Sequence, residues 1–442
     1  MSPLRLAACV FAVYALVGVM IAASSSASSA PELHPPGPAT AYALAETPLP
    51  PAPSSRLWLH GDDYEPDAAL GVGLGARAFE LPGTRLDDAA FLAGGDLVAA
   101  TRVTPKDELL EPTLLRVERV DPAERPTLVW EAAALGASPI GLAASGDRGI
   151  AAWTQRAYPG RDLAFATFGG DGPARVTIVP WPFGAAEGAV APRALALDEG
   201  VLVCAGTVDR APACALVDAA GEATLGPELK ALSGARPLTL LPAPGGGAWL
   251  FAEVCADAAT CRRGRLVLQT LDANGAPHGA HRRLGNFELG RGLAAVTVDG
   301  GALLFGKRPG AKKGAAWLIE PRRMKELEGK WGRAVGGMRT AEGAVVVEMA
   351  SLRMLDGRPV ASLRARRWTR SDGRLPREAW PEGVKEAIPT ATDLDVRPIP
   401  GGTLAWDTSG LGVIRGVALR HVAGPETTEA AAPDPQTARA ER

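Results

Sequence analysis

The residues most able to form bonds or bind metal are four cysteines, which fall into two pairs. Cys204 and Cys214 lie ten residues apart, and Cys255 and Cys261 lie six residues apart. Paired cysteines at matching places of a repeat predict disulfides in an exported chain. A zinc site is the alternative, but zinc knuckles use shorter cysteine spacings than these. We therefore predict two disulfides, Cys204 with Cys214 and Cys255 with Cys261.

Metal ligands and catalytic motifs are sparse in the rest of the chain. An acidic stretch could supply oxygen ligands to calcium, although a solvated loop explains it as well: Asp62, Asp63, Glu65 and Asp67. His278 and His281 are three residues apart but have no carboxylate nearby. The sequence contains no HExxH, Gly-x-Ser-x-Gly, phosphate-loop or EF-hand motif. We predict no catalytic residue, no metal and no cofactor.

Positive charge is concentrated in one part of a chain whose formal net charge is −2. Between Gly301 and Trp380 there are 18 Lys and Arg against 8 Asp and Glu. Such a patch could meet anionic lipid, acidic polysaccharide or an acidic partner, and a solvated arginine-rich face is the alternative. Nucleic acid is not expected, because the strands carry no aromatic stacking motif. The possible binding patch consists of Lys307, Arg308, Lys312, Lys313, Arg364, Arg366, Arg367 and Arg370.

The elements that would position these residues are short strands that recur along the chain. The clearest copy has an apolar strand at residues 248–254, a second at 266–271, and a tight turn at Asp272-Ala-Asn-Gly275. The same pattern recurs about every 51 residues, at the turn glycines Gly95, Gly149, Gly200, Gly247, Gly301, Gly343 and Gly402. Four strands per repeat of this length are typical of a β-propeller. We predict an all-β fold with seven four-stranded blades.

The amino-acid sequence of the clearest copy resembles a known style of repeat. GGGAWLFAEV followed by VLQTLDANGAPHG is similar to the repeats of propeller-type proteins exported by bacteria. The resemblance covers roughly residues 86–421 and concerns the repeat style rather than a characterised family. It implies a propeller fold and an exported setting, and it brings no active-site residues with it.

Composition divides the chain into four parts. Residues 1–30 hold an apolar run followed by small residues, which predicts a signal peptide or an uncleaved membrane anchor. Residues 31–55 are rich in Pro and Ala and predict a tether, while residues 424–442 predict a disordered tail. We expect residues 56–423 to form the propeller domain. We expect a monomeric protein in the periplasm, cell envelope or medium, in contact with the membrane only through an uncleaved N-terminal segment.

Three further predictions concern how the ring is built. The last repeat is one strand short, and residues 76–81 lack a partner, so we expect them to complete the seventh blade. Residues 320–331 predict a short helix that begins at Pro321. The tryptophans at similar repeat positions predict packing between blades, as for Trp130, Trp153, Trp249, Trp317, Trp368 and Trp406.

Two functions from different classes remain open. The favoured interpretation is a non-enzymatic module that binds a protein or glycan of the envelope through the variable loops between second and third strands. The alternative is a hydrolase or lyase whose carboxylates gather around the central channel from several blades. The expected innermost strands at residues 194–197, 238–241 and 294–298 are apolar, which favours the first interpretation. Asp393 and Asp395 are the exception.

Overall fold

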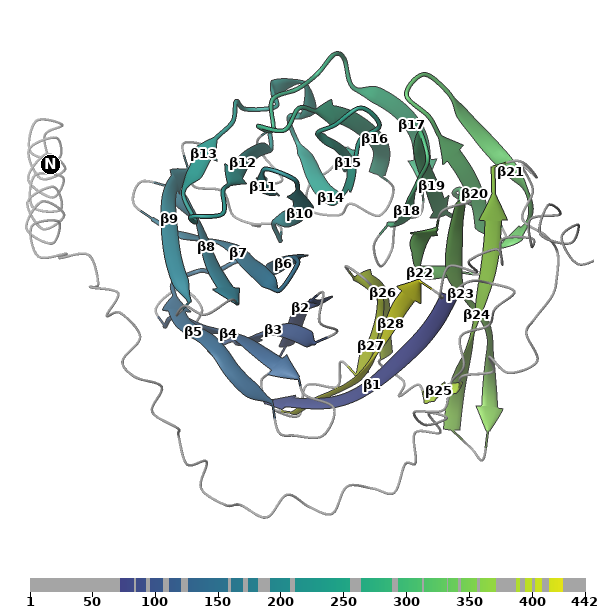
Figure 1. The fold of residues 1–442 in the computed structure, drawn as a ribbon, viewed down its shortest axis with the longest axis horizontal. Helices are drawn as coiled ribbons and strands as arrows, with labels where there is room; N and C mark the ends of the chain where they lie inside the picture. Colours follow the sequence, from purple (N-terminus) through teal and green to yellow (C-terminus); the bar gives the residue numbers. More distant parts are fainter. Residues whose placement is uncertain are drawn as a thin grey trace, which may run out of the picture. The chain divides into compact units, whose positions relative to one another are not determined.

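In a computed structural model, the described part of the protein is built almost entirely from β-strands (Figure 1). The single helical turn among the described residues is the 3-10 helix Lys230–Leu232. The structure describes residues 72–82, 85–92, 96–105, 111–120, 126–157, 160–169, 174–181, 191–206, 211–254, 264–287, 293–311, 314–331, 333–340, 343–355, 358–370, 387–389, 394–399, 402–407 and 413–423.

The strands of the first four sheets follow one another along the chain. The first sheet contains β2 (Arg85–Phe91), β3 (Leu97–Val103), β4 (Thr113–Val120) and β5 (Thr127–Ala134). The second contains β6 (Gly141–Ser145), β7 (Arg148–Arg156), β8 (Arg161–Gly169) and β9 (Arg175–Trp181). The third contains β10 (Arg193–Leu197), β11 (Gly200–Ala205), β12 (Ala213–Val217) and β13 (Ala223–Leu225). The fourth contains β14 (Ala235–Pro242), β15 (Ala248–Val254), β16 (Gly264–Leu271) and β17 (Arg282–Phe287).

Three further sheets follow, so that the described strands form seven antiparallel sheets of four strands each. The fifth contains β18 (Ala294–Val298), β19 (Gly301–Gly306), β20 (Gly314–Ile319) and β21 (Met324–Trp331). The sixth contains β22 (Arg333–Thr340), β23 (Gly343–Leu355), β24 (Arg358–Thr369) and β25 (Ala387–Pro389). The seventh contains β26 (Leu394–Ile399), β27 (Gly402–Asp407), β28 (Val413–Ala423) and β1 (Val72–Pro82).

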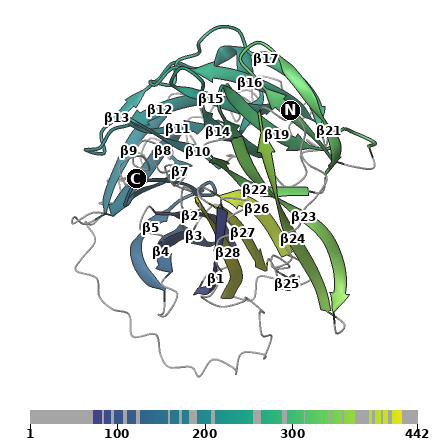
Figure 2. The same ribbon diagram turned by 45° about the vertical axis from the view of Figure 1, so that its right-hand side comes forward.

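The sheets are arranged around an axis, with the first strand of each sheet innermost (Figures 1 and 2). Each innermost strand contacts the innermost strand of the next sheet, from β2 to β6 and onward, and β26 contacts β2 again. This succession closes a ring. The predicted all-β propeller fold is therefore confirmed.

The ring closes through a strand from the other end of the chain. β1 pairs antiparallel with β28, so that Ala76 lies opposite Leu419 and Pro82 lies opposite Val413. The prediction that residues 76–81 complete the last sheet is therefore confirmed. Closure in this way covers the edge of β28, which would otherwise be open to pairing with another chain, and joins the two ends of the described chain in one sheet.

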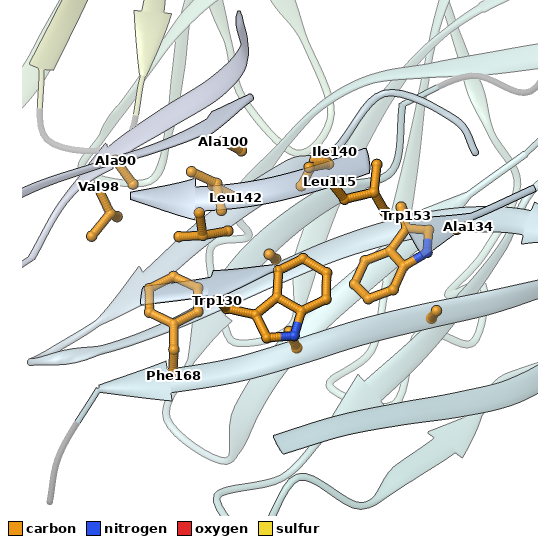
Figure 3. Close-up of a cluster of buried hydrophobic side chains, with 14 of the residues drawn as sticks. Ala90, Val98, Ala100, Leu115, Trp130, Ala134, Ile140, Leu142, Trp153 and Phe168 are labelled. Carbon is orange, nitrogen blue, oxygen red and sulfur yellow. The ribbon is translucent and has the colours of Figure 1, made fainter. Parts of the chain in front are cut away.

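Hydrophobic cores lie between neighbouring sheets. Figure 3 shows one of them, in which Trp130 from β5 and Trp153 from β7 approach each other with ring centroids 4.9 Å apart. A second core pairs Phe287 and Trp317 edge to face at 4.8 Å. Trp130, Trp153, Trp249, Trp317 and Trp368 are all buried. Packing between sheets therefore explains these five tryptophans, as predicted.

The predicted helix at residues 320–331 is wrong, because this segment contains strand β21. Its backbone pairs with β20, where Ile319 lies opposite Met324 and Leu318 lies opposite Lys325. β20 is a buried strand whose outer edge needs hydrogen-bond partners, and β21 supplies them. Sheet formation at this edge overrides a helical propensity that is only a weak prior.

Several predictions fall outside the described residues. They are the N-terminal signal or anchor, the tether, the C-terminal tail and the acidic stretch proposed for calcium. No helix in the described part of the chain has the length and hydrophobicity needed to cross a bilayer.

Candidate functional site

One face of the ring collects the ends of strands from every sheet. Neighbouring strands of a sheet are antiparallel and therefore run in opposite directions. The start of the first strand, the end of the second and the start of the third thus lie at the same end of the sheet. The connection from one sheet to the next also arrives at this end. We call this side, with the connections that follow β3, β5, β7, β9 and their equivalents, the loop face.

Arginines lie at the start of four of the seven described innermost strands, at the loop face. Arg85, Arg193 and Arg333 are the first residues of β2, β10 and β22, and Arg236 is the second residue of β14. We call these four residues the axial arginines. They come from four different sheets, and the ring brings the starts of their strands to the same side of the molecule around one axis.

The axial arginines differ in exposure and in partners. The side chain of Arg85 is 65% exposed, and its Nε lies 3.9 Å from Oδ1 of Asp87. Arg236 is half-buried and its Nε donates to Oε2 of Glu253 at 2.6 Å, while the Glu253 side chain itself is buried. Arg193 is half-buried at the start of β10. Guanidinium groups in this arrangement can bind carboxylate, sulfate or phosphate oxygens through paired hydrogen bonds.

Two consecutive carboxylates of β2 connect the first sheet to the second. The pairing of β2 with β3 shifts register between Leu86 and Asp88, and this bulge allows Asp87 and Asp88 to turn toward the same neighbour. Asp87 Oδ2 accepts from the Ile140 N–H at 3.0 Å, and Asp88 Oδ2 accepts from the Leu142 N–H at 2.9 Å. Both carboxylates therefore fix the start of β6, which is a structural role.

Asp87 is an ion-pair partner rather than an accessible acid or base. Its side chain is 1% exposed and pairs with Arg102, which is 7% exposed. Burial raises the pKa of Asp87, and the Arg102 guanidinium and the Ile140 N–H act against this shift. A carboxylate so enclosed cannot meet a substrate without opening the junction between two sheets.

Asp395 is an acidic residue on an innermost strand of the ring. It is the second residue of β26, whose start lies at the loop face, and it lies opposite Trp406 in the pairing of β26 with β27. β26 contacts β2 of the neighbouring sheet. Its backbone therefore lies at the same end of the ring as the axial arginines. Asp393 lies outside the described residues.

The structure bears on one of the two predicted disulfides. Cys204 and Cys214 lie directly opposite each other on β11 and β12 and form a disulfide. Both cysteines are fully buried, so the bond lies within the sheet rather than in the loop that follows. Cys255 and Cys261 lie outside the described residues, so their bond stays a prediction.

The residues of the predicted basic patch occupy different parts of the ring. Arg308 precedes β20, donates to Glu326 at 2.5 Å and lies over the Trp317 ring. Arg370 follows β24 and donates to Glu320, which follows β20. These two arginines therefore come from opposite faces of the ring. Lys307 lies beside Arg308, Arg364, Arg366 and Arg367 lie along β24, and Lys312 and Lys313 lie outside the described residues.

The described residues contain no group of three or more His, Cys, Asp or Glu side chains that could hold a metal ion. Sequence reasoning missed the axial arginines, although a signal was present. An arginine directly precedes the apolar innermost strand in RALAL, RPLTLL and RAVGG.

Comparison with known proteins gives matches in structure alone. No model of a known protein family matches the sequence, and no curated protein matches it. A Bombyx mori GH32 β-fructofuranosidase is 9% identical with a TM-score of 0.32, covering 78% of this chain and 93% of that one. A mutant Trypanosoma rangeli sialidase with trans-sialidase activity is 12% identical with a TM-score of 0.38, covering 75% and 60%. Trypanosoma rangeli sialidase in complex with sialic acid is 8% identical with a TM-score of 0.36, covering 81% and 58%.

These neighbours correct the functional prediction made from the sequence. All three are enzymes by name, and this finding contradicts the interpretation of the chain as a non-enzymatic binding module. At these TM-scores the likenesses assign neither a substrate nor a catalytic residue. The resemblance to exported bacterial repeat proteins is confirmed only as far as the propeller fold, since no family matches.

Proposed function

We propose that the protein is a hydrolase or lyase that cleaves a negatively charged substrate at the loop face, around the axis of the ring. The observation that carries this proposal is that four innermost strands from different sheets each have an arginine at their start, at one end of the ring. An array assembled from separate sheets can hold one anion from several sides, which no single strand could do.

The arginines have a distinct part in each of the two reactions. In a lyase, guanidinium groups that neutralise a substrate carboxylate make the proton on the adjacent carbon easier to remove. In a hydrolase, the same contacts place the scissile bond beside the water and the acid–base group. In both reactions the anionic group is bound rather than changed. The arginines would therefore affect KM as well as kcat.

Asp395 is the proposed acid–base residue. In a lyase its carboxylate removes the proton next to the substrate carboxylate, and the electron pair forms a carbon–carbon double bond as the bond from carbon to the leaving oxygen breaks. The departing oxygen then takes up the proton, which regenerates the carboxylate. In a hydrolase it takes a proton from water, whose oxygen bonds to the carbon of the scissile bond as the bond from that carbon to the leaving oxygen breaks. The departing oxygen takes up the proton, which regenerates the carboxylate. The two routes give different products, which makes them separable by experiment.

The test is a panel of oligosaccharides that carry carboxylate or sulfate groups, each with its neutral analogue. The purified protein should cleave at least one anionic member and leave the neutral analogue intact. A new ultraviolet absorbance from the double bond identifies a lyase, whereas new reducing ends without it identify a hydrolase. Asp395→Asn should abolish turnover, and Arg85→Gln should raise KM several-fold because Arg85 is exposed at the site.

A matched control is Arg265→Gln, which removes an exposed arginine of β16 that is not on an innermost strand. This variant should keep full activity. Equal cleavage of charged and neutral substrates, or full activity in Asp395→Asn, would overturn the proposal. Absence of cleavage across the whole panel by a folded protein would count against it as well.

A further inference from the structure

Two arginines face each other across adjacent strands of the second sheet. Arg156, the last residue of β7, lies directly opposite Arg161, the first residue of β8. Like charges at opposed positions of an antiparallel pair destabilise the sheet. The position lies at the loop face, at a larger distance from the axis than the innermost strand β6, since the strand order is β6-β7-β8-β9.

The Arg161 guanidinium is held in place by neutral oxygens. Its Nη2 donates to the carbonyl of Gly136 at 2.5 Å and to that of Thr154 at 3.0 Å, and its Nε donates to Thr154 Oγ at 3.2 Å. Among the residues that the structure describes, no carboxylate pairs with Arg161 or with the exposed Arg156. Burial lowers the pKa of Arg161, and the Arg156 charge lowers it further.

Among the nearby residues that the structure describes, none pairs a carboxylate with these two arginines. Asp162 follows Arg161 in β8, so its side chain lies on the opposite face of the sheet. The first sheet offers a contrast, because its buried Arg102 has Asp87 as a counter-ion. Both Arg102 and Arg161 bind the connection between β5 and β6, through the carbonyls of Ala137 and Gly136. Only Arg102 is neutralised by a described carboxylate.

We propose that Arg156 and Arg161 together bind an oxyanion, namely a carboxylate, sulfate or phosphate group. The hydrogen bonds of Arg161 fix its guanidinium before the ligand arrives, so little side-chain freedom is lost on binding. An anion between the two arginines turns a repulsive pair into a bridged one. This site is separate from the axial arginines and does not depend on the proposed function.

The experiment measures the melting temperature of the full chain in chloride, inorganic sulfate, inorganic phosphate and glucuronate at equal ionic strength. At least one oxyanion should raise the melting temperature by several degrees over chloride, and the three arms identify the preferred group. Arg156→Gln should abolish most of this rise, with at least ten-fold weaker binding by calorimetry. Because Arg156 is exposed, this variant should fold normally.

A second variant gives a readout that does not need a ligand. Arg156→Glu places a carboxylate opposite Arg161, so it should raise the melting temperature in chloride and remove the response to oxyanions. Arg265→Gln is the matched control, because Arg265 is exposed near the start of the third strand of its sheet and faces Val254. It should keep the full response. An equal response in Arg156→Gln, or no response in the wild type, would overturn the proposal.

Discussion

Glu118 is a buried acid whose protonation changes near neutral pH. It lies on β4 opposite Ala99 and is 5% exposed. Burial raises the pKa of Glu118 from 4.5 to about 7, and the Arg116 guanidinium only partly opposes this shift. The folded protein thus keeps a proton that the unfolded chain releases above pH 4.5. Stability therefore falls as the pH rises from the unfolded toward the folded pKa, by at most about 3 kcal/mol.

Replacement of Glu118 by Gln should remove this pH dependence. At about pH 8 we expect Glu118→Gln to raise the free energy of unfolding by ~1–3 kcal/mol, because no charge needs to be buried. At about pH 4.5 the change should be small, since both side chains are then neutral. Urea denaturation at the two pH values measures the difference. An equal effect at both would contradict the assignment.

The Arg102–Asp87 pair should be costly to break from one side. Arg102→Met leaves a buried carboxylate without its cation and should cost about 3–5 kcal/mol near neutral pH. The loss should shrink in acid, because removal of Arg102 raises the pKa of Asp87 further and a protonated Asp87 needs no counter-ion. Thermal unfolding as a function of pH measures this change.

The double variant Asp87→Asn with Arg102→Met provides the control. The amide oxygen introduced by Asp87→Asn can still accept the Ile140 N–H but carries no charge, so the double variant should be more stable than Arg102→Met alone at neutral pH. Additive losses would show that the two residues do not act as a pair.

At the scale of the element, the disulfide and the tight turn of the next sheet meet. A Cβ on Gly275 would lie 2.7 Å from Cys214 Cβ, and Gly275 has φ +80, so only glycine fits here without strain. Asp272 stabilises this turn by accepting from the N–H groups of Asn274 and Ala276, both at 2.9 Å. The predicted turn of the fourth sheet thus packs against the disulfide of the third sheet.

Loss of the Cys204–Cys214 bond should lower stability measurably. A loop of this length predicts a loss of about 2–3 kcal/mol for Cys204→Ala with Cys214→Ala. The midpoint of guanidinium denaturation gives the loss, and the wild type in reductant should match the variant. A variant midpoint equal to that of the oxidised wild type would show that the bond does not support the fold.

The sequence predicted strands and turns well but did not locate the candidate site. Alternating apolar residues and glycine turns are local signals, so AWLFAEV and its equivalents were recognised as strands. The helix predicted at residues 320–331 was wrong because long-range pairing with β20 decides the conformation of this segment. The axial arginines were missed for a different reason, because an arginine at the start of one strand does not show which strands meet around the axis. Each is ordinary in its own strand, and only ring closure brings the four to one end.

At the scale of the molecule, the pairing of β1 with β28 decides whether the ring is closed. A chain that begins at Thr84 lacks β1 and should melt at a much lower temperature and associate through the exposed edge of β28. A chain that begins at Gly71 keeps β1 and should behave like the full protein. Size-exclusion chromatography and calorimetry measure both effects. A monomeric Thr84 chain with unchanged melting would contradict this role of β1.

A synthetic peptide with the sequence of Val72–Pro82 serves as the control for the truncated chain. It should restore the monomer and much of the stability by pairing with β28, as the native strand does. A scrambled peptide of the same composition should not. Rescue by both peptides would point to a nonspecific effect.

The same closure has a consequence for how the protein is made. β1 is the first described strand to leave the ribosome, and its partner β28 is the last, so the whole of the remaining ring is synthesised before the two can pair. During that interval the nascent chain carries a strand without a partner, which is the state most open to pairing with other chains. Synthesis of β28 is thus the step that allows the strand without a partner to pair and the ring to close. Ribosome stalling shortly before β28 should leave a product that chaperones or proteases recognise.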